Sequence, residues 1–225
     1  MTDLNHYFQN NPGRLIHKWL HYFPIYEHHF ARFRNQPITL LEFGVFHGGS
    51  LQMWKHYFGP QAKIIGVDIN PECKAFEEEQ IEIIIGDQEN RQFLADLGAA
   101  IPPIDILIDD GGHRMNQQIT TFEEMYGKIT AQGVYLCEDT MTSYWSRHGG
   151  GYRNPNSFIE YSKNLIDLLH AWHSKDQESF NCTPFTQMTD SIHFYNSVVA
   201  IEKSPQQKPS HQKTGTPSFF NQPPC

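Results

Sequence analysis

Two groups of acidic residues, each placed just after a short apolar run, are the residues of this chain best suited to chemistry. The segment DDGGH at 109–113 follows the apolar run 104–108, and the pair Glu138-Asp139 follows the run 133–137. In an open parallel sheet, ligands bind where the strands end. Four carboxylates gathered at one edge would repel one another and raise their own pKa values unless a cation held them. The pattern therefore predicts a site for a hard divalent cation, with a histidine beside it.

Length and composition restrict the class of protein that these residues serve. The chain has 225 residues of which 39% are hydrophobic, enough to bury one full core. Its net charge of -8 argues against a nucleic-acid binder, because phosphate contacts need a basic face. No apolar run approaches the roughly 20 residues of a membrane span, and the first residues do not resemble a secretory signal. We expect a soluble, cytoplasmic protein with neither nucleic acid nor membrane as a partner.

Cysteines and histidines give weaker signals. The cysteines show no CxxC spacing, which predicts reduced thiols rather than a disulfide framework or a zinc site: Cys73, Cys137, Cys182 and Cys225. The pairs His17/His21 and His28/His29 have spacings that one metal ion could share. Because no carboxylate or cysteine is placed with either pair, surface or packing roles are favoured over ligation.

Apolar runs that alternate with helical stretches predict a doubly wound, Rossmann-like α/β sheet that is mostly parallel. The expected buried strands are 38–43, 63–69, 81–85, 104–108 and 134–137. The expected helices are 50–57, 72–79, 89–97, 116–128 and 154–173. The stretches 191–196 and 197–201 predict two further strands in antiparallel pairing near the C-terminal end.

The chain divides into three parts by pattern. Residues 1–36 carry an aromatic pattern that fits one or two helices interrupted at Pro24, and this helical extension should pack on the main domain or on a neighbouring subunit. We therefore expect a homo-oligomer. Residues 37–202 form the α/β domain. Residues 203–225 are rich in Pro, Gln, Ser and Lys with little to bury, which predicts a disordered tail.

The first expected strand leads into a glycine-rich turn and then a helix, with Glu42, Gly44, Gly48 and Ser50 as candidate ligand-binding residues. Glycine lets the backbone approach a ligand closely, and the start of a helix offers free N–H donors. The spacing is not GxGxxG, and an acid with a wider loop suits a ligand that bears an amino acid group better than a pyrophosphate. The alternatives are a solvated acid at Glu42 and a packing role for the glycines.

The next two strand ends also carry polar residues. Asp68 ends the second strand, where an acid can accept hydrogen bonds from ribose hydroxyls, and Asp87 and Gln88 end the third, where they can contact an adenine edge. Each Asp could instead cap the helix that follows. Their occurrence at consecutive strand ends favours nucleoside binding.

Four motifs of the chain resemble the class I S-adenosylmethionine-dependent methyltransferases, and among them the macrocin and mycinamicin sugar O-methyltransferases. They are LEFGVFHGGS (41–50), GVDINP (66–71), IDILIDDGGH (104–113) and GVYLCEDTMTSYW (133–145), and the resemblance covers about 38–201. It implies transfer of a methyl group from S-adenosylmethionine to a hydroxyl, in natural product biosynthesis and with magnesium. The acceptor implied is a small molecule, a glycosylated metabolite. The mycinamicin relative has a long auxiliary domain before the first strand, so its substrate closure and oligomer architecture do not transfer.

The resemblance also implies roles for individual residues. Asp110, Glu138 and Asp139 match the metal ligands, and His113 matches the catalytic base that acts beside Asp110. Ligands that offer only oxygen favour Mg²⁺ or Mn²⁺ over Zn²⁺. Asp109 faces the other side of the chain, toward the methyl donor or behind the metal ligands.

Four alternatives stay open at this point. The DDGG segment would also suit a plain turn, although a turn does not require a second acidic pair at the adjacent strand end. Tyr144 and Trp145 are expected to wall an acceptor pocket, since aromatic faces suit sugars, or else to be core residues. A nicotinamide-dependent oxidoreductase, counted against by the absent GxGxxG, and a non-catalytic nucleoside-binding module are the rival functions.

Overall fold

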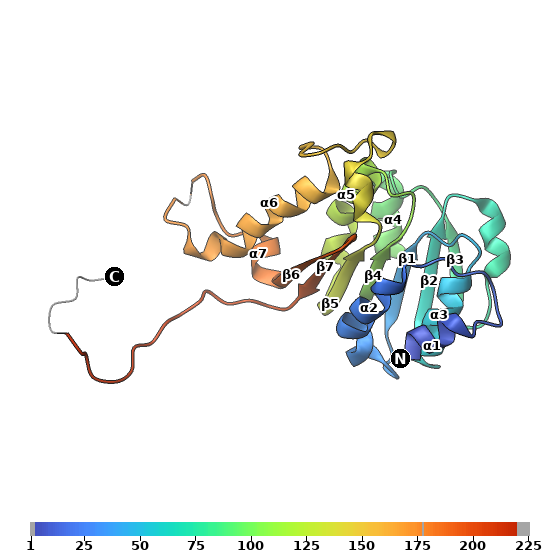
Figure 1. Ribbon diagram of the computed structural model, residues 1–225, viewed down its shortest axis with the longest axis horizontal. Coiled ribbons are helices and arrows are strands. Elements are labelled where there is room, and N and C mark those ends of the chain that lie inside the picture. The colour runs from blue at the N-terminus through green and yellow to red at the C-terminus, as the bar shows by residue number, and fades with distance from the viewer. Residues whose placement is uncertain (1–2, 177, 220–225) are drawn as a thin grey trace.

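A seven-stranded sheet in the order β3-β2-β1-β4-β5-β7-β6 forms the centre of the computed structural model, which describes residues 3–176 and 178–219. The strands are β1 (Thr39–Phe43), β2 (Lys63–Asp68), β3 (Ile81–Ile85), β4 (Ile104–Asp109), β5 (Ile129–Cys137), β6 (Thr189–Tyr195) and β7 (Val198–Lys203). Strands β1 to β5 pair in parallel, whereas β7 is antiparallel to both β5 and β6. The predicted sheet is confirmed, with its antiparallel C-terminal pair (Figure 1).

Helices cover both faces of this sheet, because successive strand residues alternate between the faces and both sets are apolar. The helices are α1 (Asp3–Gln9), α2 (Phe23–Phe30), α3 (Gly49–Phe58), α4 (Arg91–Ala100), α5 (Met115–Met125), α6 (Phe158–His170) and α7 (Pro184–Met188). Helices α1, α2 and α3 share one buried cluster with the sheet, and α4, α5 and α6 share the other (Figure 1). The chain order thus winds around the sheet in both directions, with the reversal between β1 and β4.

Short 3-10 turns complete the element list, and two of them correct the sequence prediction. They are η1 (Leu20–Tyr22), η2 (Ala31–Phe33), η3 (Pro71–Phe76), η4 (Tyr126–Lys128), η5 (Thr140–Tyr144), η6 (Ser146–His148) and η7 (Ala171–His173). The helix expected over 72–79 is the 3-10 turn η3. The helix expected over 154–173 begins only at Phe158, because the Ser157 hydroxyl caps it by accepting from the Glu160 N–H at 3.3 Å, and it ends in η7.

The N-terminal extension differs from the expected pair of helices in its middle part. Residues 10–19 form neither helix nor strand, so the helical prediction for the apolar positions from Leu15 to Trp19 was wrong. Both of those side chains are exposed, which leaves no buried helical face there. Pro24 does not interrupt a helix but lies in the first turn of α2, where its missing N–H would have had no partner.

The chain beyond β7 contains no helix or strand as far as residue 219. The N–H groups of Ser204 and Gln206 still donate to carbonyl oxygens of α7, and farther along the chain leads away from the sheet (Figure 1). Residues 220–225, the end of the predicted disordered tail, lie outside the described residues, and so does Cys225. Cys73, Cys137 and Cys182 are free thiols. Among the described helices, none is both long and apolar enough to cross a membrane.

Candidate active site

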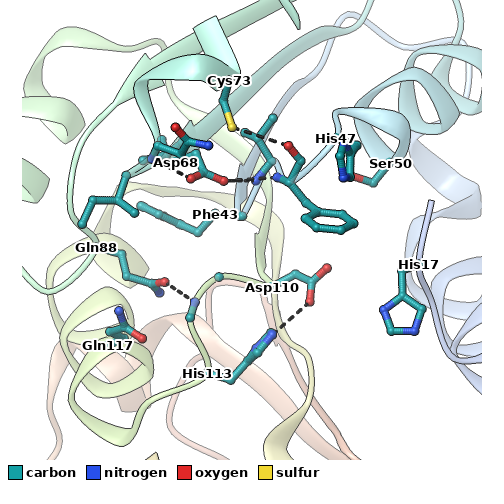
Figure 2. Close-up of a pocket in the computed structure, with 18 of the residues that line it drawn as sticks. His17, Phe43, His47, Ser50, Asp68, Cys73, Gln88, Asp110, His113 and Gln117 are labelled. Carbon is teal, nitrogen blue, oxygen red and sulfur yellow. Dashed lines mark hydrogen bonds and ion pairs between the residues drawn. The ribbon is translucent and has the colours of Figure 1, made fainter. Parts of the chain in front are cut away.

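A cavity of about 580 Å³ opens at the carboxyl ends of β1, β2, β3 and β4. This is the edge at which open α/β sheets bind ligands, next to the reversal of strand order. Of the residues predicted to bind the methyl donor, five line this cavity: Gly44, Ser50, Asp68, Asp87 and Gln88. Of the predicted metal ligands and the predicted base, three residues line the cavity: Asp110, His113 and Asp139. One cavity therefore joins both halves of the predicted site (Figure 2).

The glycine loop after β1 is held in place by the acid at the end of β2. Asp68 Oδ2 accepts hydrogen bonds from the N–H groups of Val45 at 2.8 Å and Phe46 at 3.2 Å, and Oδ1 accepts from Asn70 N–H at 2.9 Å. A carboxylate offers about four lone-pair sites, so Asp68 keeps acceptor capacity toward the cavity. Gly44 has φ +95°, and a Cβ there would lie 2.0 Å from the Asp110 carbonyl oxygen. Only glycine allows the two loops to pass this closely.

Glu42 lies behind this loop and does not line the cavity. Its side chain is fully buried and accepts hydrogen bonds from the Ser50 hydroxyl at 2.9 Å and Trp54 Nε1 at 3.2 Å. Burial raises the pKa of Glu42 from 4.5 to about 7. The alternative of a solvated strand-end acid is therefore excluded. Gly48, another predicted donor-binding residue, is the N-cap of α3 at φ +73° and also lies outside the lining.

The end of β3 is tied to the loop after β4 by a buried amide. Gln88 Nε2 donates to Asp109 Oδ1 at 2.9 Å, and Gln88 Oε1 accepts from Gly112 N–H at 2.9 Å. Asp109 has no exposed surface and does not reach the cavity, and burial raises its pKa. Asp109 thus acts behind the 110–113 loop and Asp110 in front of it. Asp87 Oδ1 accepts from Glu89 N–H at 2.8 Å, so this side chain combines a turn role with its place in the cavity wall.

Asp110, His113 and Asp139 form a compact group of possible metal ligands, in which one ligand atom from each lies within 4.8 Å of the others. His113 Nε2 is 3.9 Å from Asp110 Oδ1 and 3.6 Å from Asp139 Oδ2 (Figure 2 shows the first pair). Both His113 and Asp139 have positive φ, +55° and +51°. Such a conformation costs on the order of 1–3 kcal/mol for a non-glycine residue, and two instances side by side are typical of a functional site.

A buried lysine supplies a cation that the sequence analysis did not find. Lys18 Nζ lies 2.5 Å from Asp110 Oδ2, 2.9 Å from both carboxylate oxygens of Glu138 and 3.5 Å from Glu42 Oε1. Its side chain is 2% exposed. Burial by itself would lower the pKa of Lys18, but the three carboxylates raise it well above its usual range. The repulsion expected among the acids is thus relieved by a residue of the N-terminal extension.

Glu138 is directed at this lysine rather than at the cavity. It is 1% exposed, and besides Lys18 it accepts a hydrogen bond from the Tyr26 hydroxyl at 2.7 Å. Burial, followed by the charge of Asp110, raises its pKa, and Lys18 acts in the opposite direction. Glu138 therefore lies apart from the ligand group of Asp110 and Asp139.

The N-terminal segment also forms one wall of the cavity, through Leu15, Ile16, His17 and Lys18. A Cβ at Gly49 would lie 2.3 Å from the Leu15 carbonyl oxygen, so this glycine lets the segment pack on the start of α3. The sequence indicated that the clustered carboxylates need a cation, but nothing in it identified Lys18 as that cation.

The two aromatic residues expected in the acceptor pocket lie in the loop after Asp139. Tyr144 ends η5 and Trp145 follows it, and their side chains are 52% and 39% exposed. They are surface residues, so the core alternative is excluded. Neither lines the cavity itself.

No protein-family model matches the chain. It is 35% identical over 196 residues to an 8-demethyl-8-α-L-rhamnosyl tetracenomycin-C 2'-O-methyltransferase of Streptomyces olivaceus, covering 83% of this chain and 51% of that protein. It is 34% identical over 204 residues to the demethylmacrocin O-methyltransferase of Streptomyces fradiae, covering 84% and 51%. The chain thus spans about half the length of the curated relatives it matches.

Among solved structures, the chain is similar to a methyltransferase from the mycinamycin biosynthetic pathway in complex with Mg and SAH. The TM-score is 0.82 at 30% identity, over 91% of this chain and 55% of that one. A second structure of that enzyme, in complex with Mg, SAH and mycinamycin VI, gives 0.82 at 29% identity. The fold is therefore that of the class I methyltransferases. Within that class, the predicted similarity to the macrocin and mycinamicin sugar O-methyltransferases is confirmed over most of this chain.

Proposed function

We propose that this chain transfers a methyl group from S-adenosylmethionine to a hydroxyl of a sugar or another small polyol, with a glycosylated metabolite as acceptor. One observation carries the proposal. The same cavity is lined by the strand ends suited to a nucleoside, at Gly44, Asp68 and Asp87, and by the group of Asp110, His113 and Asp139. The names of the relatives support the chemistry, because they describe O-methylation of rhamnosyl tetracenomycin and of demethylmacrocin.

The donor would lie along the carboxyl ends of β1, β2 and β3. Gly44 leaves room for the backbone to approach the amino acid part, and the Ser50 hydroxyl lies at the start of α3. Asp68 would accept a hydrogen bond from a ribose hydroxyl with the remaining lone pair of Oδ1, and Asp87 would contact the adenine. Glu42 and Asp109 support these loops from behind, and Gln88, which also lines the cavity, ties the end of β3 to the loop after β4.

The acidic group fits a divalent cation such as Mg²⁺ or Mn²⁺. Asp110 and Asp139 present carboxylates to the cavity, and their ligand atoms lie close enough for one ion to bind both. Glu138, the third proposed ligand, lies apart from this pair with both carboxylate oxygens on Lys18, so it would reach the ion only if Lys18 withdrew. A cation bound there would supply Lewis acidity that lowers the pKa of an acceptor hydroxyl.

His113 is the proposed general base. Its Nε2 faces the cavity between Asp110 and Asp139, where it would accept the proton of the acceptor hydroxyl as that oxygen attacks the methyl carbon. The Nδ1 atom of the same ring is buried and has no hydrogen-bond partner among the described residues, so Nε2 is the nitrogen available for this step. Tyr144 and Trp145 are proposed as an apolar platform for the sugar at the cavity mouth.

The test is an assay of methyl transfer with purified protein, S-adenosylmethionine and a panel of glycosides that carry vicinal hydroxyls, with and without Mg²⁺. We expect a methylated glycoside and S-adenosylhomocysteine in equal amounts, and loss of both on chelation. A thermal shift with NAD but not with S-adenosylmethionine would favour the oxidoreductase instead. Donor binding without metal dependence and without transfer to any acceptor would indicate a binding module.

A further inference from the structure

A second group of metal-ligand residues lies outside the active-site cavity, between the N-terminal extension and the C-terminal hairpin. His28 and His29 lie in α2, and His193 lies in β6. One ring nitrogen from each lies within 4.8 Å of the other two. The active-site cavity is lined by none of them. The sequence offered only the adjacent pair in α2, and the fold adds a third imidazole from β6.

His29 has the hydrogen bonding of a metal ligand. Its side chain is fully buried, Nδ1 lies 2.5 Å from Glu202 Oε1, and Nε2 lies 3.0 Å from the Tyr195 hydroxyl. An ionised carboxylate can only accept, so Nδ1 carries the proton and Nε2 accepts from the Tyr195 hydroxyl, whose rotation would turn this lone pair over to an ion. A carboxylate that holds one nitrogen of a histidine while the other binds metal is the usual arrangement in zinc sites.

His193 also has one nitrogen available. Its Nε2 is 2.9 Å from the Ser191 hydroxyl, which leaves Nδ1 for a ligand.

His28 completes the group from the surface. It is exposed, and its ring centroid lies 4.8 Å from that of His29 and 6.0 Å from that of His193. The side chain is thus free to rotate over the other two rings without rearrangement of the core. The remaining oxygen of Glu202 pairs with Arg32 at 2.5 Å, so the carboxylate behind His29 is itself fixed.

We propose that His28, His29 and His193 bind one Zn²⁺ ion, with water or the Tyr195 hydroxyl in the fourth position. Imidazole nitrogens suit zinc, and a tetrahedral site with Zn–N of about 2.0 Å needs nitrogens about 3.3 Å apart. The three ligand atoms, now within 4.8 Å of one another, would therefore have to draw closer around the ion, and the exposed His28 is the side chain with room to move. The ion would join α2 to the β6–β7 hairpin and so fix the extension that carries Lys18 into the active site.

The test uses untagged, full-length protein stripped with a chelator, because an added histidine tag would bind the same metals. Zinc binding is measured by calorimetry and by elemental analysis after dialysis. The background is the double variant Asp110→Asn with Asp139→Asn, which removes the acidic group as a competing site. We expect one zinc ion per chain in this background, and a tetrahedral absorption spectrum when Co²⁺ replaces it.

Two variants of the cluster should lose this binding, and one control should keep it. His28→Gln changes an exposed residue, so this variant should fold normally. His28→Gln and His193→Gln, each made singly, should abolish the stoichiometric zinc binding and the rise in melting temperature that zinc causes. Glu202→Gln should weaken zinc binding about 10–100-fold, as loss of the group behind a ligand does. His173→Gln, at an exposed histidine of η7, should bind zinc like the parent. Absence of stoichiometric zinc from the double variant, or undiminished binding by His28→Gln, would overturn the proposal.

Discussion

Replacement of Lys18 by methionine tests the claim that one buried ammonium holds the acidic edge of the sheet together. Methionine keeps the apolar stem but removes the charge from among Asp110, Glu138 and Glu42. Loss of one partner of a buried ion pair costs about 3–5 kcal/mol, because the other charge is left buried and unpaired. Here the Tyr26 hydroxyl still binds Glu138, and Ser50 and Trp54 still bind Glu42, so we expect the lower half of that range.

The assay is urea unfolding followed by circular dichroism in the presence of a chelator. The matched control is Lys163→Met, whose ammonium pairs with Glu160 at 2.6 Å on the surface and is 50% exposed in its side chain. Such an exposed pair contributes about 0–1 kcal/mol, so the two variants should differ clearly. The defect of Lys18→Met should shrink at low pH, because protonation of the unpaired carboxylates removes their charge.

The reasoning would be refuted if Lys18→Met lost less than about 1 kcal/mol, as the surface control does. A double-mutant cycle sharpens the test. Adding Glu138→Gln removes one of the carboxylates that Lys18 neutralises, so the double variant should be more stable than the sum of the single losses predicts. Coupling of about 0.5–3 kcal/mol is typical of residues in direct contact, and strict additivity would show that the contact is not energetically significant.

The remaining predictions concern the chemistry and the pH dependence of the site. His113→Ala should bind donor and metal normally but lose about 10²–10⁴-fold in turnover, and unchanged turnover on the true substrate would remove the base assignment. Asp139→Asn should weaken Mg²⁺ binding in calorimetry far more than S-adenosylmethionine binding, and unaltered metal affinity would contradict the ligand set. Because burial holds the pKa of Glu42 at about 7 rather than 4.5, the folded state binds the extra proton between these values and stability falls as pH rises through them. Glu42→Gln should remove this decline in the free energy of unfolding, which amounts to about 3 kcal/mol at 1.36 kcal/mol per pKa unit. Unfolding curves recorded from pH 4.5 to 7.5 measure it, and an unchanged pH dependence in the variant would count against the raised pKa of Glu42.

Much of the sheet was predictable because buried strands and amphipathic helices leave local patterns in the sequence. The runs before Asp68 and Asp110 are strands β2 and β4, and their ends meet at one edge as parallel strands must. The prediction failed where the pattern was apolar but not buried. Residues 10–19 include large apolar side chains, yet they form no helix, and residues 15–18 among them line the cavity.

By itself, the sequence determined that acids and a histidine gather at the carboxyl edge of a doubly wound sheet, since local periodicity locates the strand ends and parallel strands bring those ends to one edge. Tertiary structure alone decided which charges face each other. Lys18 reaches Asp110 across 92 positions of the chain and Glu138 across 120. The same holds for His193, which joins His28 and His29 only because β6 lies beside α2. Contacts between segments so distant leave no periodic trace, so only the folded chain shows that the cation among the acids is a lysine.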